Sequence, residues 1–213
     1  SKYGYIDKTG TIVIDPIFSD ARDFNDGLAR VKVSGKYGFI NKKGQFIIEP
    51  KFQDAEDFSE GYAIITDGAE YCPLYGFINT NGIVQIKPQF RSAKAFRNSR
   101  AAVMIGDKWG YIDKNGNLVV SPVFSTVCPY YEGLARVTYD TQLRGNRWGF
   151  IDLNGEIIVP FIDKSKFGMY GGFSEGLAPV LFGDTNKTSQ NHKEEYGYID
   201  KTGKWVINLQ DWV

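Results

Sequence analysis

Short apolar runs alternate with short polar segments along the whole chain, and their order is fixed. In the first unit, the run from Tyr3 to Ile6 is followed by Asp7-Lys8-Thr9-Gly10 and then by Ile12-Val13-Ile14. Aromatic and β-branched runs bounded by Asp, Gly and Pro are typical of β-strands. We therefore predict one strand at residues 3–6 (the A strand) and a second at 12–14 (the B strand). Between them, Asp7 is expected to bond nearby amides while Gly10 takes a positive φ, as in a tight hairpin turn.

The same pattern returns five more times, and such periodicity indicates a tandem repeat. We interpret residues 1–213 as a single repeat array whose units begin at residues 3, 37, 75, 109 and 148, with a partial sixth that begins at 196. Each unit starts with an aromatic residue and a glycine. A glycine inside a strand indicates that a ring or backbone lies against it, and we expect the aromatic residue to pack over a neighbouring repeat. These structural motif residues are Tyr3, Gly4, Tyr37, Gly38, Tyr75, Gly76, Trp109, Gly110, Trp148, Gly149, Tyr196 and Gly197.

The B strand carries apolar residues at consecutive positions, such as Ile12-Val13-Ile14 and Phe46-Ile47-Ile48. This pattern predicts a strand that is buried on both faces. A proline follows, which is Pro16 in the first unit. Because proline cannot donate a ladder hydrogen bond, we expect it to mark the end of strand pairing.

The connector after the proline carries two aromatic residues, Phe18 and Phe24 in the first unit, and we predict a compact loop pinned by buried rings. Asp26-Gly27 then predicts a sharp bend, and Leu28–Val31 a third strand (the C strand) that leads into the next unit. The third unit has Asn98-Ser99 in place of the acid and glycine. We therefore expect a looser or differently shaped bend there.

These elements predict an all-β fold. Antiparallel neighbours joined by short turns favour a meander of C, A and B strands, so we predict a tandem repeat array of three-stranded antiparallel units that forms an open, twisted solenoid-like body. The alternative is a β-propeller, because units of this length suit its blades, although blades normally have four strands. In an open array, the end repeats would expose apolar edges unless flanking sequence covers them.

The recurring sequence is the aromatic-Gly-aromatic-Ile-Asp-Lys-x-Gly run, then a proline, then Glu-Gly-Leu-Ala-x-Val. This combination resembles the WG-repeat family of bacterial proteins over essentially the whole chain. The resemblance implies a β-rich repeat module, often attached to other domains, with no catalytic residues assigned to the motif. Only Trp109 and Trp148 carry the tryptophan, and tyrosine takes its place in the other units.

The repeats differ mainly by insertions between C and A strands, at Asp67 to Leu74, Thr138 to Arg147 and Gly183 to Glu195, with another at Asp163 to Gly172 in a connector. Insertions at equivalent loops gather on one edge of an array, where partners commonly bind. The alternative is loop drift without function. On the first interpretation, the partner-binding rim includes Tyr71, Tyr139, Arg144, Arg147 and His192.

Charge and composition narrow the function further. Lys plus Arg and Asp plus Glu both number 25, so net charge does not favour nucleic acid or an anionic membrane, and no apolar run is long enough for membrane insertion. Cys72 and Cys128 lie at non-equivalent positions, which favours free thiols and slightly favours a cytoplasmic location. We expect no cofactor, metal site or catalytic residue, because the single histidine, His192, lies in a polar loop and the recurring acids suit backbone bonding.

We therefore predict a non-catalytic repeat scaffold, one part of a larger bacterial protein. Its partner would be another protein or a flanking domain of the same polypeptide. The alternative is a glycan or cell-envelope binding module, since sugars stack on exposed aromatic rings. That alternative requires the recurring tyrosine and tryptophan rings to face solvent.

Overall fold

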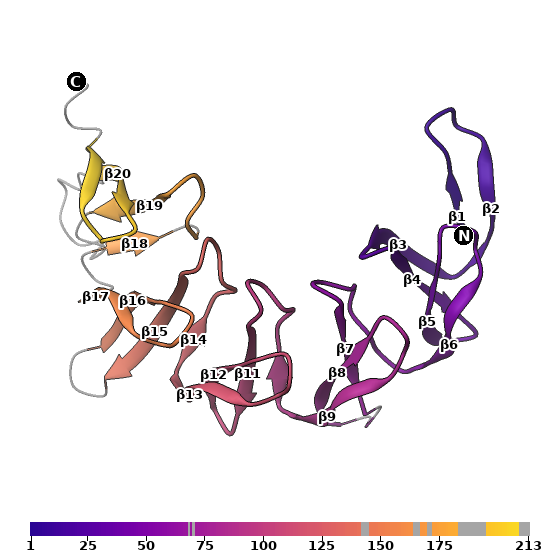
Figure 1. The fold of residues 1–213 in the computed structure, drawn as a ribbon, viewed down its shortest axis with the longest axis horizontal. Helices are drawn as coiled ribbons and strands as arrows, with labels where there is room; N and C mark the ends of the chain where they lie inside the picture. The colour runs from indigo at the N-terminus through magenta and orange to yellow at the C-terminus, as the bar shows by residue number, and fades with distance from the viewer. Residues whose placement is uncertain are drawn as a thin grey trace. The chain divides into compact units, whose positions relative to one another are not determined.

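A computed structural model describes residues 1–67, 69, 71–141, 145–163, 167–169, 172–182 and 195–208. These residues form β-strands and turns without a helix, and none of the sheets closes on itself (Figure 1). The chain divides into two compact units, Ser1–Phe96 with Lys114–Gly116 and Arg97–Asp113 with Asn117–Val213. The first unit contains β1 (Tyr3–Ile6), β2 (Ile12–Phe18), β3 (Asp20–Asn25), β4 (Leu28–Val33), β5 (Lys36–Ile40), β6 (Phe46–Phe52), β7 (Tyr62–Thr66), β8 (Tyr75–Asn79), β9 (Val84–Phe90) and β10 (Ser92–Ala93). The second contains β11 (Ala101–Ile105), β12 (Lys108–Ile112), β13 (Leu118–Phe124), β14 (Thr126–Val127), β15 (Ala135–Thr141), β16 (Gly145–Ile151), β17 (Ile157–Asp163), β18 (Phe167–Met169), β19 (Leu177–Phe182), β20 (Glu195–Asp200) and β21 (Trp205–Asn208).

The predicted meander of C, A and B strands is confirmed. It occurs as β4-β5-β6, β7-β8-β9, β11-β12-β13, β15-β16-β17 and β19-β20-β21, with every neighbouring pair antiparallel. The first sheet has only the A and B strands, β1 and β2. The all-β array of small antiparallel units that the sequence predicts is therefore the observed architecture.

The connector, which the sequence predicts to be a loop, adds a fourth strand. After the B strand the chain runs back along the following C strand, so that β3 pairs with β4, β14 with β15 and β18 with β19. The connector does contain buried rings, as predicted, with Phe58 and Phe96 among them. Four strands per sheet is the number found in a propeller blade.

The proline does not end strand pairing, which corrects the prediction. Pro16 lies inside β2, where Tyr5 pairs with Ile14 and Tyr3 pairs with Phe18. Two residues of β1 therefore span four of β2, and the proline occupies the resulting bulge, a position that needs no ladder amide. In the second sheet, a Cβ on Gly38 would lie 2.6 Å from the Ile48 carbonyl oxygen and 2.7 Å from the Pro50 nitrogen. The motif glycine is thus required because the bulge backbone passes over it.

The bend in the third unit is also not looser than the others. Asn98 and Ser99 have φ values of 49° and 61°, close to the 50° and 83° of Asp26 and Gly27. Arg97 and Arg100 close the turn with two reciprocal backbone hydrogen bonds, as Ser59 and Tyr62 do at another bend. Two positive φ values in a two-residue hairpin define a type I′ turn. Asn tolerates the left-handed region, so the same turn type forms here. The strained residue is Ser99, because its Cβ disfavours a positive φ.

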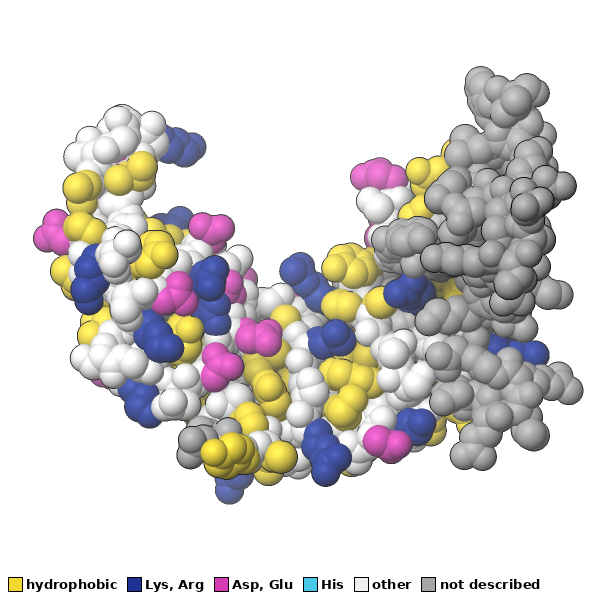
Figure 2. Space-filling model, turned by 180° about the vertical axis from the view of Figure 1, so that it is seen from behind, with side chains coloured by type: hydrophobic (Ala, Val, Ile, Leu, Met, Phe, Trp, Pro, Cys, Tyr) yellow, Lys and Arg dark blue, Asp and Glu magenta, His cyan; other side chains and the backbone are white. Residues whose placement is uncertain are grey.

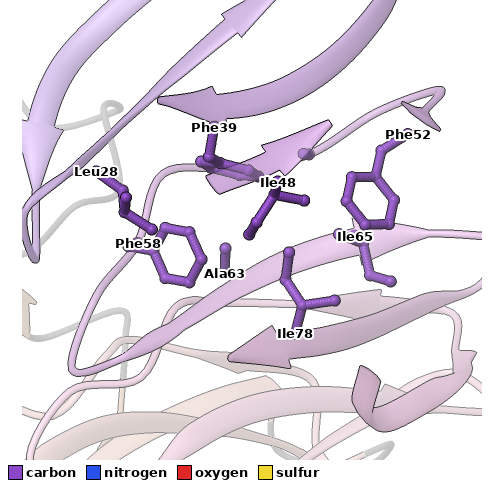
Figure 3. Packing of buried hydrophobic residues seen from close by; sticks show 9 residues of the cluster. Leu28, Phe39, Ile48, Phe52, Phe58, Ala63, Ile65 and Ile78 are labelled. Atoms are coloured by element: carbon purple, nitrogen blue, oxygen red, sulfur yellow. The ribbon is translucent and has the colours of Figure 1, made fainter. Parts of the chain in front are cut away.

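The core consists of layers between successive sheets. In one layer, Phe39 from β5 and Ile48 from β6 meet Phe58 of the connector and Ala63 and Ile78 of the following sheet (Figure 3). Its Phe39 and Phe58 rings are 4.8 Å apart in an edge-to-face arrangement, which favours the pair beyond simple burial. An equivalent ring pair occurs in each of the first five repeats: Tyr5–Phe24, Phe39–Phe58, Phe77–Phe96, Tyr111–Tyr130 and Phe150–Phe173.

Candidate interaction surface

The motif tyrosine and tryptophan rings do not form a solvent-facing row. Trp148 is buried, Tyr37, Tyr75 and Trp109 are half-buried, and only Tyr3 is exposed among the described rings. Tyr196 has no described side chain. The face of the Tyr37 ring is also covered, because Lys32 Nζ lies 4.5 Å and Arg30 Cζ 5.1 Å from its centroid. The solvent-facing rings that sugar stacking requires are therefore not present as a set among the described residues.

The hairpin acids bond their own turn, as predicted. The Asp7 carboxylate accepts hydrogen bonds from the Thr9 hydroxyl at 2.6 Å and from the Thr9 and Thr11 amides at 2.8 and 3.0 Å. These donors favour the charged form and lower the pKa of Asp7, the Thr9 side chain most strongly. Asp200 has the same arrangement with Thr202 and Lys204, and its pKa is lowered for the same reason. These carboxylates stabilise turns.

The acids at the bends join neighbouring sheets. The Gly61 amide donates to Asp26 Oδ2 at 2.7 Å, and the Gly176 amide donates to Glu132 Oε2 at 3.0 Å. The Gly133 amide likewise donates to the side-chain oxygen of Asn98, Oδ1, at 3.0 Å. The recurring acid and glycine are therefore partners across successive repeats, a contact that the pattern of a single repeat does not predict.

Lysines from the hairpin turns reinforce two of these bends. Lys201 Nζ lies 3.0 Å from Glu132 Oε2, and Lys114 Nζ lies 3.7 Å from Glu60 Oε2. The hydrogen bond from Lys201, followed by that from the Gly176 amide, lowers the pKa of Glu132. The lysine in the Asp-Lys-x-Gly turn thus has a structural role in holding one sheet to the preceding one.

The structure describes only part of the predicted rim. In the first compact unit, Tyr71 is 82% exposed. It lies in a loop where the Asp67 side chain accepts hydrogen bonds from the Ala69 and Leu74 amides. Tyr139 is exposed in the second unit and pairs with Arg147 across a hairpin. Arg144 and His192 lie outside the described residues. The shared rim remains a prediction.

The insertion at 138–147 is largely strand and not loop. β15 and β16 pair from Ala135↔Ile151 to Thr141↔Gly145, so the added residues lengthen two existing strands. Arg147 is half-buried, and its Nε is buried with no hydrogen-bond partner in the described part of the chain. Arg147 therefore belongs partly to the sheet surface.

The B strands carry exposed apolar side chains, which corrects the prediction that both faces are buried. Ile12 and Val13 are exposed while Ile14 is buried. The register shifts between Tyr5 and Ile6, so β2 has an extra residue at this point and the alternation of faces is interrupted. The B strand is also the last strand of each meander, with a neighbour on one side only.

One position is apolar in every repeat and opposes the isoleucine of the A strand. It lies two residues after the turn glycine, and five of its six side chains are between 39% and 59% exposed. The sixth, Phe46, is half-buried against Phe18. We call these residues the apolar row: Ile12, Phe46, Val84, Leu118, Ile157 and Trp205.

Within each of the two compact units, every successive sheet contributes one residue to the apolar row. The turn glycine before Phe46, Gly44, is covered by Ile14, and Gly82 before Val84 is covered by Ile48. Successive row positions are therefore separated by about 10 Å, the spacing of packed sheets. In the sequence, the row is indicated by the position of the B strand as the last of the three strands in each meander. Such an edge strand has a neighbour on one side only.

The surface carries both signs of charge. Figure 2 shows basic and acidic side chains interspersed among apolar ones over the described part of one face. The Glu56 side chain is partly buried. Burial raises its pKa, and the nearby Arg30 opposes this shift. Within the described residues, no group of three or more His, Cys, Asp or Glu side chains is arranged to hold a metal ion. The same residues include no helical segment with the length and apolarity needed to cross a bilayer.

Stacked antiparallel sheets, ring pairs and linked bends define a tandem β-repeat protein. The WG containing repeat model matches residues 3–37, 37–71, 75–109, 109–140, 148–185 and 196–210. The chain therefore belongs to the WG-repeat family, as the sequence predicts. The six matched segments begin at residues 3, 37, 75, 109, 148 and 196.

Comparison with solved structures gives a similar fold in a much longer protein. The crystal structure of the tricorn protease aligns with a TM-score of 0.52 and 10% sequence identity, over 86% of this chain and 21% of that chain. At this identity the likeness concerns the β-fold alone. No curated protein sequence matches the chain.

Proposed function

We propose that this chain is a non-catalytic repeat scaffold that binds another protein, or a flanking domain of the same polypeptide, through the apolar row. The observation that carries the proposal is the recurrence of exposed apolar side chains at one position of the edge strands. Exposed apolar surface is costly in water, and its grouping on a soluble fold commonly marks a binding surface. Within one compact unit, a partner that follows successive sheets would bury one row residue per repeat.

The other recurring residues support a scaffold because their roles are internal. The rings pair between strands and connectors, the hairpin acids bond their own turns, and Asp26 and Glu132 bond the next sheet. A carboxylate engaged in this way stabilises the repeat and is poorly placed for acid–base chemistry. The row is a recurring feature that these contacts leave exposed.

The test compares three variants of the intact chain as bait in an extract of the cells that produce it. The row variant carries Ile12→Thr, Val84→Thr, Leu118→Thr and Ile157→Thr, and threonine retains strand propensity. The matched control carries Val13→Thr, Ile17→Thr, Val123→Thr and Val206→Thr, which are also exposed. A rim variant carries Tyr71→Ser and Tyr139→Ser.

We expect one or more proteins whose recovery, measured by quantitative mass spectrometry, falls at least about tenfold with the row variant and is unchanged with the matched control. Loss with the rim variant alone would move the binding surface to the insertions. Equal recovery with the row variant and the unmodified chain would contradict the proposal. Circular dichroism of each bait establishes that the sheets are retained.

A further inference from the structure

The apolar row is regularly spaced within the second compact unit. Its three residues there are Leu118 of β13, Ile157 of β17 and Trp205 of β21, and they are 52%, 57% and 39% exposed. The sheets that carry them pack on one another in sequence order, because the turn glycine of each later sheet is covered by a valine of the preceding B strand. These contacts are Gly155 with Val120 and Gly203 with Val159. Neighbouring row residues are therefore about 10 Å apart, and the first and last are about 20 Å apart.

A strand added to an edge of these sheets would not follow the row. Such a strand runs alongside one edge strand, so it would contact the row residue of a single sheet. In addition, β13 and β17 contain Pro122 and Pro160, and both strands have a register shift against the A strand. Proline and bulges obstruct the addition of a strand at an edge. A partner that contacts successive row residues must therefore cross the edge strands.

An α-helix matches the spacing of the row. Residues seven apart in a helix lie on the same face, and at a rise of about 1.5 Å per residue they are about 10.5 Å apart. A polyproline II segment repeats its face every third residue, at about 9.3 Å, and typically binds grooves lined by aromatic rings, whereas Leu118 and Ile157 are aliphatic. The flanks of the row also suit a helix, because the exposed Glu156 and Lys204 directly precede Ile157 and Trp205. An amphipathic helix carries charged residues beside its apolar stripe.

We propose that Leu118, Ile157 and Trp205 bind an amphipathic α-helix of a partner protein, in which an apolar residue recurs at every seventh position. This inference rests on the proposed function, in which the apolar row is the binding surface, and it adds the type of element that binds there. The helix crosses the three edge strands and places one apolar residue against each row residue. A basic residue beside its middle apolar residue and an acidic one beside its last would complement Glu156 and Lys204.

The probe is a fluorescein-labelled helical peptide of about 21 residues, built from alanine, glutamate and lysine with a leucine at every seventh position. A control peptide of the same composition has its leucines at every fifth position, which places them on different faces of the helix. A proline-rich peptide with a leucine at every third position tests the polyproline II alternative. Each peptide is titrated with the full chain and followed by fluorescence anisotropy. We expect saturable binding of the first peptide, at least about tenfold tighter than that of the other two.

The protein variant that combines Leu118→Thr and Ile157→Thr should weaken binding of the first peptide at least about tenfold. Its matched control combines Val123→Thr and Val206→Thr, which are also exposed in the second compact unit, and should leave binding unchanged. Circular dichroism establishes that both variants retain their sheets.

Three results would overturn the helix: no saturable binding up to about 1 mM peptide, equal binding of the control peptide, or tighter binding of the proline-rich peptide. Binding of the first peptide that is unchanged by Leu118→Thr and Ile157→Thr would place the helix elsewhere and also overturn the inference. The extract experiment separates these results from a failure of the proposed function. If the row variant still loses its partner there, the row remains the binding surface and only the helix is wrong.

Discussion

At the residue scale, glycine meets two different requirements in each repeat. Gly38 has an extended conformation, and what it needs is space, because the backbone of the bulge at Ile48 and Pro50 passes over it. Gly35 has open space around it, and what it needs is a positive φ of 82° in the turn between β4 and β5. A larger residue would therefore have a steric cost at Gly38 and a conformational cost at Gly35.

Gly38→Ala should destabilise the chain far more than Gly35→Ala. The new methyl of Gly38→Ala would meet backbone atoms that cannot rotate away, and we expect a loss of roughly 3 kcal/mol in the free energy of unfolding. For Gly35→Ala we expect about 1 kcal/mol, from the left-handed backbone alone. Urea unfolding followed by far-ultraviolet circular dichroism measures both variants. Similar losses for the two would contradict the close approach at Gly38.

Ser99→Gly should stabilise the chain. Ser99 has a φ of 61°, a region that costs a residue with a Cβ about 1–2 kcal/mol. Glycine removes this strain, although it also makes the unfolded chain more flexible, so we expect a net gain of about 1 kcal/mol. The reverse change at an equivalent bend, Gly133→Ser, is the matched control and should destabilise, since Gly133 has a φ of 84°. Urea midpoints that shift in the same direction for both would disprove this account.

At the element scale, stability depends on links between consecutive sheets. Glu132 joins two of them, because its carboxylate receives the Gly176 amide and the Lys201 ammonium. Its pKa is lowered below the ordinary value of 4.5. A carboxylate with a lowered folded-state pKa contributes stability that is fully present above the unfolded-state pKa and is lost as the pH falls through the folded-state pKa.

Glu132→Gln should therefore lower the thermal midpoint near neutral pH and have a progressively smaller effect as the pH falls below 4.5. Glutamine can still accept the Gly176 amide but carries no charge for Lys201. Thermal unfolding of both proteins between about pH 7 and pH 3 measures the difference. Glu175→Gln is the control, since its carboxylate has no such partner among the described residues. A difference that stays constant across the range would contradict the role of the ionised carboxylate.

The sequence predicts features that form within one repeat well, and contacts between repeats poorly. The Asp7 turn follows from the chemistry of Asp and Gly within five residues, and both the meander and its strand order follow from short connections. The bond from Gly61 to Asp26 joins residues in different repeats, so a single-repeat pattern does not contain it. Ile12 and Ile14 have the same chemistry, and only the bulge and the open edge of β2 determine that one is exposed and the other buried.

The candidate surface shows the same limit. An exposed apolar row cannot be distinguished from a buried strand by hydrophobicity alone, because Ile12-Val13-Ile14 satisfies both patterns. The insertions, by contrast, are visible in the sequence, yet their length does not predict whether they form loops. At Thr138 to Arg147 the added residues extend a hairpin, since backbone pairing satisfies their polar groups.

At the scale of the whole molecule, each repeat is stabilised mainly by its neighbours in the chain. Arrays of this kind behave as a sum of repeat stabilities and nearest-neighbour interfaces, so a repeat with one interface is weaker than a repeat with two. The second sheet packs on the first through Ile14, Phe18 and Ile40, and on the third through Phe39, Phe58 and Ile78. The first sheet has only the former interface among the described residues.

In a protein that consists of residues 1–213 alone, native-state hydrogen exchange should therefore show a gradient of protection from the first sheet to the second. We expect amides of β1 and β2 to exchange at least about tenfold faster than the equivalent amides of β5 and β6, because opening the first sheet breaks one interface and opening the second breaks two. The comparison controls for local sequence, since Tyr5 pairs with Ile14 in β1 and β2 as Phe39 pairs with Ile48 in β5 and β6. Ile14→Ala should lower protection in both sheets at once, because Ile14 lies in the layer between them. Equal protection of the two sheets in the unmodified chain would mean that the array opens as one cooperative unit, and the nearest-neighbour account would then be wrong.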